Sequence, residues 1–267
     1  MKYFDSHAHY YDERFSEECK EGIRAMLDTL FATSVKTIIN VGTSPKTCRA
    51  AIIQSRSYPN MHTAIGIHPT DGQYMTDSAE EALRQIEEMI ADPDSKCVAI
   101  GEIGLDYHYP DTDKEKQAFL FEEQMKLAER IGLPVVIHDR EAHGDVFDMI
   151  CKYPKVRGIL HSYSSSPEMA LELVKRGYYI SFSGTLTFKN ARRVQECAAA
   201  VPLDRVLIET DAPYLAPHPL RGTLNHSGNL LYTNRMLAEI HGISEEECAR
   251  ITAENAERIF GLCQKEQ

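Results

Sequence analysis

Eight short, apolar, β-prone runs recur along the chain, and longer amphipathic segments separate them. They follow one another at intervals of roughly 20 to 35 residues, which is the spacing of βα units. Eight such units favour a closed parallel barrel over an open sheet, and a barrel of this kind commonly takes about 250 residues. We therefore predict an α/β fold, a single (β/α)8 TIM barrel forming one domain over residues 1–267. The expected strands are residues 2–4, 37–41, 62–67, 97–100, 134–137, 158–160, 178–182 and 205–208.

The segments between the runs carry helix signals. One predicted helix face holds Ala118, Phe121, Met125 and Ala128, which repeat at helical spacing. Thr112 and Glu115 have the spacing of a capping box at the start of that helix. Ser244 and Glu247 repeat this spacing before the last helix. The sequence Gly-Leu-Pro at 132–134 is expected to end one helix and open the next strand.

The composition indicates in which compartment the protein is expected and which kinds of partner it can bind. There is no run of about 18 apolar residues and no apolar signal-peptide core at the start, so we predict no membrane span and no secretion. Seven scattered cysteines without a Cys-x-x-Cys pair indicate reduced thiols that pack as small hydrophobic residues, in the cytoplasm. The net charge of −11 disfavours broad adhesion to duplex DNA, although bound cations would reverse the charge locally and admit a phosphate substrate.

Histidines and carboxylates fall directly after the expected strands. In chain order they are His7, His9, His68, Glu102, His138, His161, Glu209 and Asp211. Barrel active sites occupy the face formed by the carboxyl ends of the strands, so these side chains are expected at one level of one face. A single histidine after a strand is usually a packing or loop residue, but five of them together with carboxylates favour a metal site.

The spacing of these groups suggests how metals would bind. His7 and His9 are separated by one residue, so on extended backbone both point to one side and reach one cation at about 2.0–2.1 Å. Six ligands exceed what one tetrahedral catalytic ion takes, which favours two cations with Glu102 as the bridge. Imidazole and carboxylate together suit Zn²⁺, Mn²⁺ or Fe²⁺, whereas Mg²⁺ prefers carboxylate and water. The identity is left open among Zn²⁺, Mn²⁺ and Mg²⁺.

At this point the chain resembles the TatD-type metal-dependent hydrolases, relatives of the amidohydrolase superfamily, over nearly its whole length. The resemblance rests on Phe-Asp-Ser-His-Ala-His at 4–9, Gly-Ile-His-Pro at 66–69 and Gly-Glu-Ile-Gly-Leu-Asp-Tyr at 101–107. It continues with Pro-Val-Val-Ile-His at 134–138, His-Ser at 161–162, Glu-Thr-Asp-Ala-Pro-Tyr-Leu at 209–215 and Asn-Ala-Glu-Arg-Ile-Phe-Gly at 255–261.

The resemblance implies a (β/α)8 barrel with a binuclear site. It assigns His7, His9 and Asp211 to one metal. It assigns His138 and His161 to the second, with Glu102 shared. It also implies a deoxyribonuclease, such as a 3′-to-5′ exonuclease on single strands, or a D-aminoacyl-tRNA deacylase.

One loop departs from the family pattern. The family usually has Arg-Gly followed by Asn-Glu-Pro, whereas this chain has Arg221-Gly-Thr-Leu and then Asn225, His226 and Ser227. The change bears on substrate preference more than on metal binding. His226 is either a site-facing imidazole or, as loop behaviour favours, a surface residue.

We expect hydrolysis by a metal-activated water, with Asp211 and Glu102 as the catalytic carboxylates. Asp211 would accept the proton of the water and pass it to the leaving group. His68, Arg140 and Arg221 are the candidate substrate contacts, since guanidinium groups bind oxyanions in a bidentate way.

Supporting roles fall to two further carboxylates. Glu209 is expected to orient a ligand histidine. Asp106 is expected to fix its loop or hold an arginine. No aromatic-plus-basic stripe that would stack successive bases is visible in the sequence. The tyrosines that follow strand ends are candidates for base stacking or for rim packing, and they are Tyr10, Tyr11, Tyr107, Tyr109, Tyr163 and Tyr214.

Three functions are consistent with these features. The favoured one is a nuclease that trims nucleic-acid ends. The second is a hydrolase of a small phosphoester, ester or amide with the same metals, which the acidic charge and the loop change keep open. The third is a non-catalytic metal-binding barrel that acts as an adaptor, which the full set of ligands disfavours.

Overall fold

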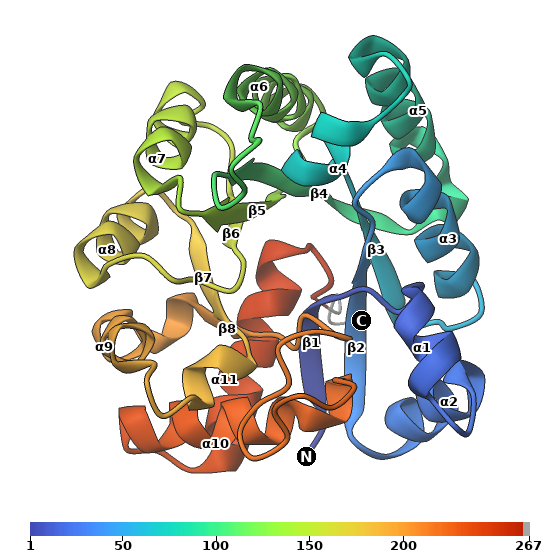
Figure 1. The fold of residues 1–267 in the computed structure, drawn as a ribbon. Helices are drawn as coiled ribbons and strands as arrows, with labels where there is room; N and C mark the ends of the chain where they lie inside the picture. The colour runs from blue at the N-terminus through green and yellow to red at the C-terminus, as the bar shows by residue number, and fades with distance from the viewer. Residues whose placement is uncertain (264–267) are drawn as a thin grey trace. The chain divides into compact units, whose positions relative to one another are not determined.

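The structure is a computed structural model, and it describes residues 1–263. Within that range, eight strands alternate with helices in the order of a (β/α)8 barrel, and the strands follow one another from β1 to β8 in one sheet (Figure 1). The predicted fold class is therefore confirmed. The chain divides into a central unit, residues 40–161 and 176–178, and a terminal unit, residues 1–39, 162–175 and 179 onward. That the whole chain forms one domain stays a prediction.

The central unit contains four complete strands and five α-helices. The strands are β3 (Met61–Ile65), β4 (Cys97–Asp106), β5 (Val135–Arg140) and β6 (Gly158–Leu160), which follow the end of β2 (Val35–Val41). The helices are α3 (Pro45–Ser55), α4 (Pro69–Tyr74), α5 (Ala79–Ala91), α6 (Lys114–Ile131) and α7 (His143–Lys152), and a short 3₁₀ turn, η1 (Pro93–Ser95), precedes β4. These strands pair in parallel, and α6 packs on β4.

Helix α6 agrees with most of the helix signals in the sequence but begins one residue later than the predicted cap implies. Phe121, Met125 and Ala128 are buried as predicted, whereas Ala118 is only half-buried. The predicted cap at Thr112 is wrong, because the Asp113 side chain accepts the hydrogen bond from the amide of the third helical residue. The Thr112 hydroxyl instead donates to the preceding turn. The helix ends at Gly132, which has the left-handed conformation (φ 76°) that glycine adopts without strain, as predicted.

The terminal unit contains the first and the last strands. It holds β1 (Tyr3–Ala8), the start of β2, β7 (Tyr179–Phe182) and β8 (Val206–Ile208). Its helices are α1 (Glu13–Glu18), α2 (Ile23–Thr33), α8 (Pro167–Lys175), α9 (Arg192–Ala200), α10 (Leu230–His241) and α11 (Glu245–Ile259). Its 3₁₀ turns are η2 (Gly184–Thr187), η3 (Leu203–Arg205) and η4 (Ser227–Asn229).

Packing in the terminal unit joins the two ends of the chain. Helix α11 lies against β1 and β8, and it is capped by Ser244, whose side chain accepts the hydrogen bond from the Glu247 amide as predicted. The buried Asn255 side chain of α11 donates to the carbonyls of Leu203 and Val206 at 2.8 and 2.9 Å. This bond satisfies the backbone where β8 begins and fixes the helix to the strand.

Three strands continue past the ends of the predicted apolar runs. β1 continues to Ala8 rather than ending at residue 4, β4 to Asp106 rather than residue 100, and β5 to Arg140 rather than residue 137. Strand pairing uses backbone groups, so it continues after the side chains change from apolar to polar. As a result, His7 and Glu102 lie inside strands, where their backbone positions are fixed.

The remaining composition-based expectations concern cysteines and membranes. All seven cysteines are free thiols, and four of them are buried. Among residues 1–263, no helix combines the length and the apolar character that crossing a bilayer requires.

Candidate metal-binding clusters

Backbone pairing in the terminal unit brings the segment after β8 beside β1. The Asp211 amide donates to the His7 carbonyl at 2.9 Å, and the His9 amide donates to the Ala212 carbonyl at 2.7 Å. Asp211 has φ 58°, a left-handed conformation that aspartate tolerates better than most residues. These contacts place the Asp211 carboxylate next to both histidines, which come from the other end of the chain.

Three side chains converge there to form the His7 cluster, defined by His7, His9 and Asp211. The two histidine Nε2 atoms are 3.1 Å apart. Asp211 Oδ1 lies 3.3 Å from His9 Nε2 and 3.7 Å from His7 Nε2. His7 is fully buried, whereas the Asp211 side chain is 14% exposed, so solvent reaches the cluster from the aspartate side.

A buried hydrogen-bond network supports this cluster. Asp5 accepts from the Thr210 amide and hydroxyl at 3.0 and 2.6 Å, from the His7 amide at 3.3 Å and from the Ser227 hydroxyl at 2.6 Å. Burial raises the pKa of Asp5 to about 6, although the bonds from Ser227 and Thr210 act in the opposite direction. One carboxyl group therefore connects β1, the segment after β8 and the turn η4.

The orientation of His9 has a support that the sequence interpretation missed. The His9 Nδ1 atom lies 3.1 Å from the Tyr11 hydroxyl, which leaves Nε2 for the cluster. Tyr11 follows His9 by two residues. Tyr11 lies in the turn that follows β1, however, so the alternation rule that paired His7 with His9 does not extend to it, and no sequence signal indicated this contact.

Strand register in the central unit assembles a second group of donors. Gly104 of β4 pairs with His138 of β5, and the His161 amide donates to the Ile137 carbonyl at 3.0 Å. The Glu102 amide donates to the Gly42 carbonyl at 3.1 Å. Each of these donor residues therefore lies in a strand or directly follows one.

These donors form the Glu102 cluster, defined by Glu102, His138, His161 and His68. Glu102, 3% exposed, has its Oε1 2.8 Å from His138 Nδ1 and 2.9 Å from His161 Nε2. The two histidine nitrogens are 3.2 Å apart. His68 Nε2 lies 3.4 Å from the same oxygen. The sequence interpretation had placed His68 among the substrate contacts, whereas the geometry brings it into the donor group.

Charge and burial act in opposite directions within the Glu102 cluster. Burial lowers the pKa of His68 to about 3, because the desolvation outweighs the attraction of Glu102. Burial also disfavours protonated His138, but its bonds to Asp106 and Glu102 outweigh this and raise its pKa. A buried carboxylate among several imidazoles favours a positive charge at the centre of the cluster.

Asp106 holds His138 from the other side. Its Oδ2 lies 3.2 Å from His138 Nε2, and its Oδ1 accepts from the His108 amide at 3.0 Å. Burial alone would raise the pKa of Asp106, but the bonds from His138 and His108 lower it overall. In the terminal unit, buried Glu209 accepts from the Ser162 amide at 2.7 Å, the residue that follows His161. Asp106 thus contacts the side chain of a candidate ligand, and Glu209 contacts the backbone next to one.

The separations within both clusters fit cation binding. Ligand atoms held about 2.0–2.1 Å from one ion lie about 3.3 Å apart in a tetrahedron and about 2.9 Å apart in an octahedron. The separations in the His7 cluster, 3.1 to 3.7 Å, and in the Glu102 cluster, 2.8 to 3.4 Å, fall around these values. Imidazole nitrogens and carboxylate oxygens are also the donor types that divalent transition metals take. The side chains are therefore positioned to bind metal.

Other predicted site residues lie outside the clusters. Arg140 is exposed at the end of β5, with its Cζ 5.8 Å from the centre of the Tyr109 ring. Arg221 is exposed, and its guanidinium stacks on the Phe188 ring at 4.1 Å. His226 caps η4, with Nδ1 accepting from the Gly228 amide at 3.2 Å. Its side chain thus serves its own turn, but it is half-buried rather than a surface residue as loop behaviour favoured.

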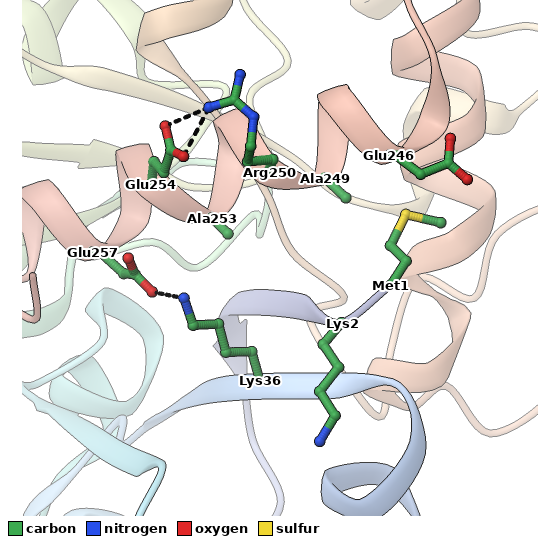
Figure 2. A pocket seen from close by; sticks show the side chains of 9 residues that line it. All are labelled: Met1, Lys2, Lys36, Glu246, Ala249, Arg250, Ala253, Glu254 and Glu257. Carbon is green, nitrogen blue, oxygen red and sulfur yellow. Dashed lines mark hydrogen bonds and ion pairs between the residues drawn. The ribbon is translucent and has the colours of Figure 1, made fainter. Parts of the chain in front are cut away.

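A pocket at the opposite end of β1 is a weaker candidate. It measures about 430 Å³ and is lined by residues that precede β1, by the start of β2 and by α11 (Figure 2). Four of its charged residues form ion pairs, Lys36 with Glu257 and Arg250 with Glu254, as Figure 2 shows, and the Lys2 ammonium donates to the Phe31 carbonyl. The amino-terminal face of a barrel strand typically serves stability. Nothing in this pocket resembles the donor groups at the other strand ends.

Comparison with known proteins identifies the family. The family model described as "TatD related DNase" matches residues 4–261. The chain belongs to the TatD family. The TatD match is supported by an uncharacterized metal-dependent hydrolase, YabD of Bacillus subtilis, which is 39% identical over 97% of this chain and 99% of its own. An uncharacterized metal-dependent hydrolase TatD of Mycobacterium tuberculosis is 33% identical over 97% of each chain.

A solved structure supports both the fold and the family. The crystal structure of YjjV, a TatD homologue from Escherichia coli, matches with a TM-score of 0.88 and 28% identity, over 97% of this chain and 98% of that one. The TatD resemblance predicted from the sequence is thus confirmed. With donor groups positioned to bind metal, the chain is a metal-dependent hydrolase of the TatD family.

Proposed function

We propose that this protein hydrolyses phosphodiester bonds at the ends of single-stranded nucleic acids, DNA in the first place, with one divalent cation in each cluster. The observation that carries the proposal is the pair of histidine–carboxylate groups at carboxyl strand ends, with separations that fit metal ligands. The family description as a related DNase supports the choice of substrate. We further propose a cytoplasmic location, to which the free thiols are suited.

The ligand assignment follows the geometry. His7, His9 and Asp211 would hold one cation. Glu102 and His138 would hold the other, together with His161, and His68 is near enough to add a fourth donor. The sharing of Glu102 between both cations stays a prediction, as does the choice among Zn²⁺, Mn²⁺ and Mg²⁺.

The chemistry requires an activated water and a group that moves its proton. A divalent cation, when bound, acts as a Lewis acid and lowers the pKa of water toward neutrality. Asp211 is the ligand side chain open to solvent in the His7 cluster, so its carboxylate is placed to accept the proton of the attacking water. The water oxygen then bonds to phosphorus and the bond to the leaving oxygen breaks. Asp211 returns the proton to that oxygen.

The same site chemistry would serve a different substrate. The net charge of −11 favours small phosphoesters, esters or amides over long polyanions. The ester bond of a D-aminoacyl-tRNA is a further alternative for the same metal chemistry, although its tRNA is a polyanion. We keep these alternatives as the second candidate function. A nuclease should lose activity as salt rises, whereas hydrolysis of a small neutral ester should change little.

The test is a metal-titrated activity screen on labelled single-stranded DNA, RNA, aminoacyl-tRNA and a small phosphodiester. Wild type is compared with Asp211→Asn and with Asp204→Asn, an exposed aspartate in the same unit that serves as the matched control. Circular dichroism confirms folding, and binding of the metal is followed by competition with a coloured chelator.

We expect metal-dependent, salt-sensitive cleavage of single-stranded DNA. Asp211→Asn should reduce turnover by at least about 10²-fold, in line with the loss of a general acid–base group. Asp204→Asn should behave as wild type. Full turnover by Asp211→Asn would refute the role of that carboxylate. Metal-loaded wild type that cleaves the small substrates but no nucleic acid would refute the nuclease and favour the second candidate.

A further inference from the structure

Two cations in the central unit rest on tyrosine rings next to the Glu102 cluster. The Arg140 guanidinium lies over the Tyr109 ring at 5.8 Å, and the Lys114 ammonium lies over the Tyr107 ring at 3.9 Å. We call these four side chains the tyrosine–cation surface. Their residues come from the loop after β4, the start of α6 and the end of β5, so the sequence alone does not bring Arg140 to the other three.

Neither cation of this surface forms a salt bridge among residues 1–263, although the Arg140 guanidinium is near enough to the Asp106 carboxylate to lower its pKa. The nearby carboxylates are engaged elsewhere: Glu141 with His108 at 2.7 Å, and Asp145 with the Tyr107 hydroxyl at 2.7 Å. Asp111 accepts from the Tyr74 hydroxyl at 2.6 Å. Even in an acidic protein, a guanidinium and an ammonium that lie over tyrosine rings can bind an anion, and the rings provide a surface on which a planar ligand can stack.

The surface is exposed and its loop is fixed. Tyr109 is 45% exposed, so its ring remains available to a ligand. Its carbonyl accepts from the Thr112 hydroxyl at 2.7 Å, and the neighbouring Asp111 carbonyl accepts from the Gln73 side chain at 2.7 Å. A ring held in this way loses little conformational freedom on binding, which favours affinity.

The tyrosine–cation surface also lies next to a candidate ligand, because Arg140 and His138 belong to the same strand, β5. Arg140 follows His138 by two residues on β5, and alternate residues of a strand project to the same side. Arg140 pairs in register with Asp106, the carboxylate that holds His138. The Tyr107 amide donates to the Arg140 carbonyl at 2.9 Å. A chain bound at the Glu102 cluster would therefore pass over this surface.

We propose that the tyrosine–cation surface binds a nucleotide of a single-stranded substrate next to the bond that is cleaved, with a base stacked on Tyr109 and a phosphate on Arg140. This inference rests on the proposed nuclease function. A single small phosphoester has no second phosphate or base to use the surface. The surface therefore selects single-stranded nucleic acid over small esters.

The test measures binding of a fluorescent oligothymidine with non-hydrolysable linkages, by anisotropy and as a function of salt, to metal-loaded protein. The variants are Tyr109→Ala, Tyr109→Phe and Arg140→Gln. Arg176→Gln is the matched control, because it removes the same charge from another cation–ring pair of the central unit, Arg176 over Phe147 at 5.1 Å. An abasic oligonucleotide of the same length is compared in parallel.

We expect Tyr109→Ala to weaken binding about tenfold, within the range for loss of one stacked base, and Tyr109→Phe to restore most of it. The weakening should disappear with the abasic strand. Arg140→Gln should reduce the slope of log affinity against log salt by about 0.7, the value for one phosphate on a single strand. Arg176→Gln should bind as wild type.

Cleavage provides the second readout. The ratio of kcat/KM for single-stranded DNA to that for a small phosphodiester should fall in Tyr109→Ala and Arg140→Gln, and stay constant in Arg176→Gln. If wild type cleaves DNA, and Tyr109→Ala and Arg140→Gln keep the wild-type affinity and the wild-type ratio of kcat/KM values, this inference is wrong and the nuclease proposal stands. If wild type neither binds nor cleaves the oligonucleotide, both are wrong.

Discussion

Replacing Ser227 by alanine should destabilise the protein by about 2–4 kcal/mol, although the change removes a single oxygen atom. The Ser227 hydroxyl donates to the buried Asp5 carboxylate at 2.6 Å, and it lies 2.7 Å from the Tyr10 hydroxyl. A hydrogen bond to a charged group contributes about 1.5–3 kcal/mol, and one between neutral groups about 0.5–1.5 kcal/mol. Alanine keeps the backbone amide that donates to Tyr10 at 2.8 Å, so only these two bonds are lost.

The assay is urea-induced and thermal unfolding in the presence of a chelator, so that metal linkage does not contribute. The expected loss corresponds to a fall in Tm of roughly 4–16 °C for a chain of this size. The matched control is Ser164→Ala, an exposed serine, which should stay within about 0.5 kcal/mol of wild type. If Ser227→Ala is as stable as this control, the buried network does not have the energetic role assigned to it.

A second readout connects this network to the metal. Asp5 also accepts from the His7 amide and from Thr210, the residue before Asp211. Loss of the Ser227 bond should loosen these contacts and weaken binding at the His7 cluster. Mutation of such supporting contacts typically costs about 10–100-fold in metal affinity. Competition with a coloured chelator measures the change; unchanged affinity in a folded Ser227→Ala variant would show that the network supports stability alone.

Three further predictions test the site and its surroundings. Asp106→Asn should weaken metal binding about 10–100-fold, because it loosens the carboxylate contact with His138, and unaltered affinity in chelator competition would contradict this. Burial lowers the pKa of His62 to about 4, so below about pH 6.5 the unfolded state binds a proton that the folded state does not, and the protein loses stability. His62→Gln removes this group, so the free energy of unfolding lost between pH 7 and pH 5 should be smaller by about 1–2 kcal/mol in urea titrations. An equal loss in both proteins would refute this prediction. Gly104→Ala should abolish metal binding and cost over about 3 kcal/mol, because Gly104 has φ 137° and an added Cβ would lie 2.0 Å from the His138 carbonyl oxygen. Gly144→Ala, which meets nothing within 4 Å on helix α7, should be neutral or stabilising in the same unfolding experiment.

Much of the candidate site could be predicted because it depends on local chemistry. His7 and His9 are separated by one residue, and the geometry of extended backbone alone brings their imidazoles together, as the 3.1 Å separation confirms. Glu102 and His138 were predicted as donors from their place after apolar runs, although both proved to lie inside their strands. The apolar runs marked where strands begin better than where they end, because pairing continues through polar residues.

Other features depended on which segments become neighbours. Ser227 and Asp5 are 222 residues apart, so nothing near Ser227 in the sequence indicates that its hydroxyl reaches a buried carboxylate. Asp106 fixes its loop as expected, by accepting from the His108 amide at 3.0 Å, but its contact with His138 was not predicted, because it depends on the register between β4 and β5. The misplaced cap at Thr112 has a local cause, because Asp113 is an equally good capping residue one position later.

The sequence by itself determined the kinds of chemical groups and their periodic placement: eight strand-like runs, with histidines and carboxylates at their ends. Periodicity is a property of the backbone conformation, so it can be recognised without knowing any contact. Only the tertiary structure decided which groups face one another, as with Asp5 and Ser227 or Tyr109 and Arg140. Such pairs depend on strand register and loop conformation, and a shift of one residue in a strand turns every side chain to the opposite face.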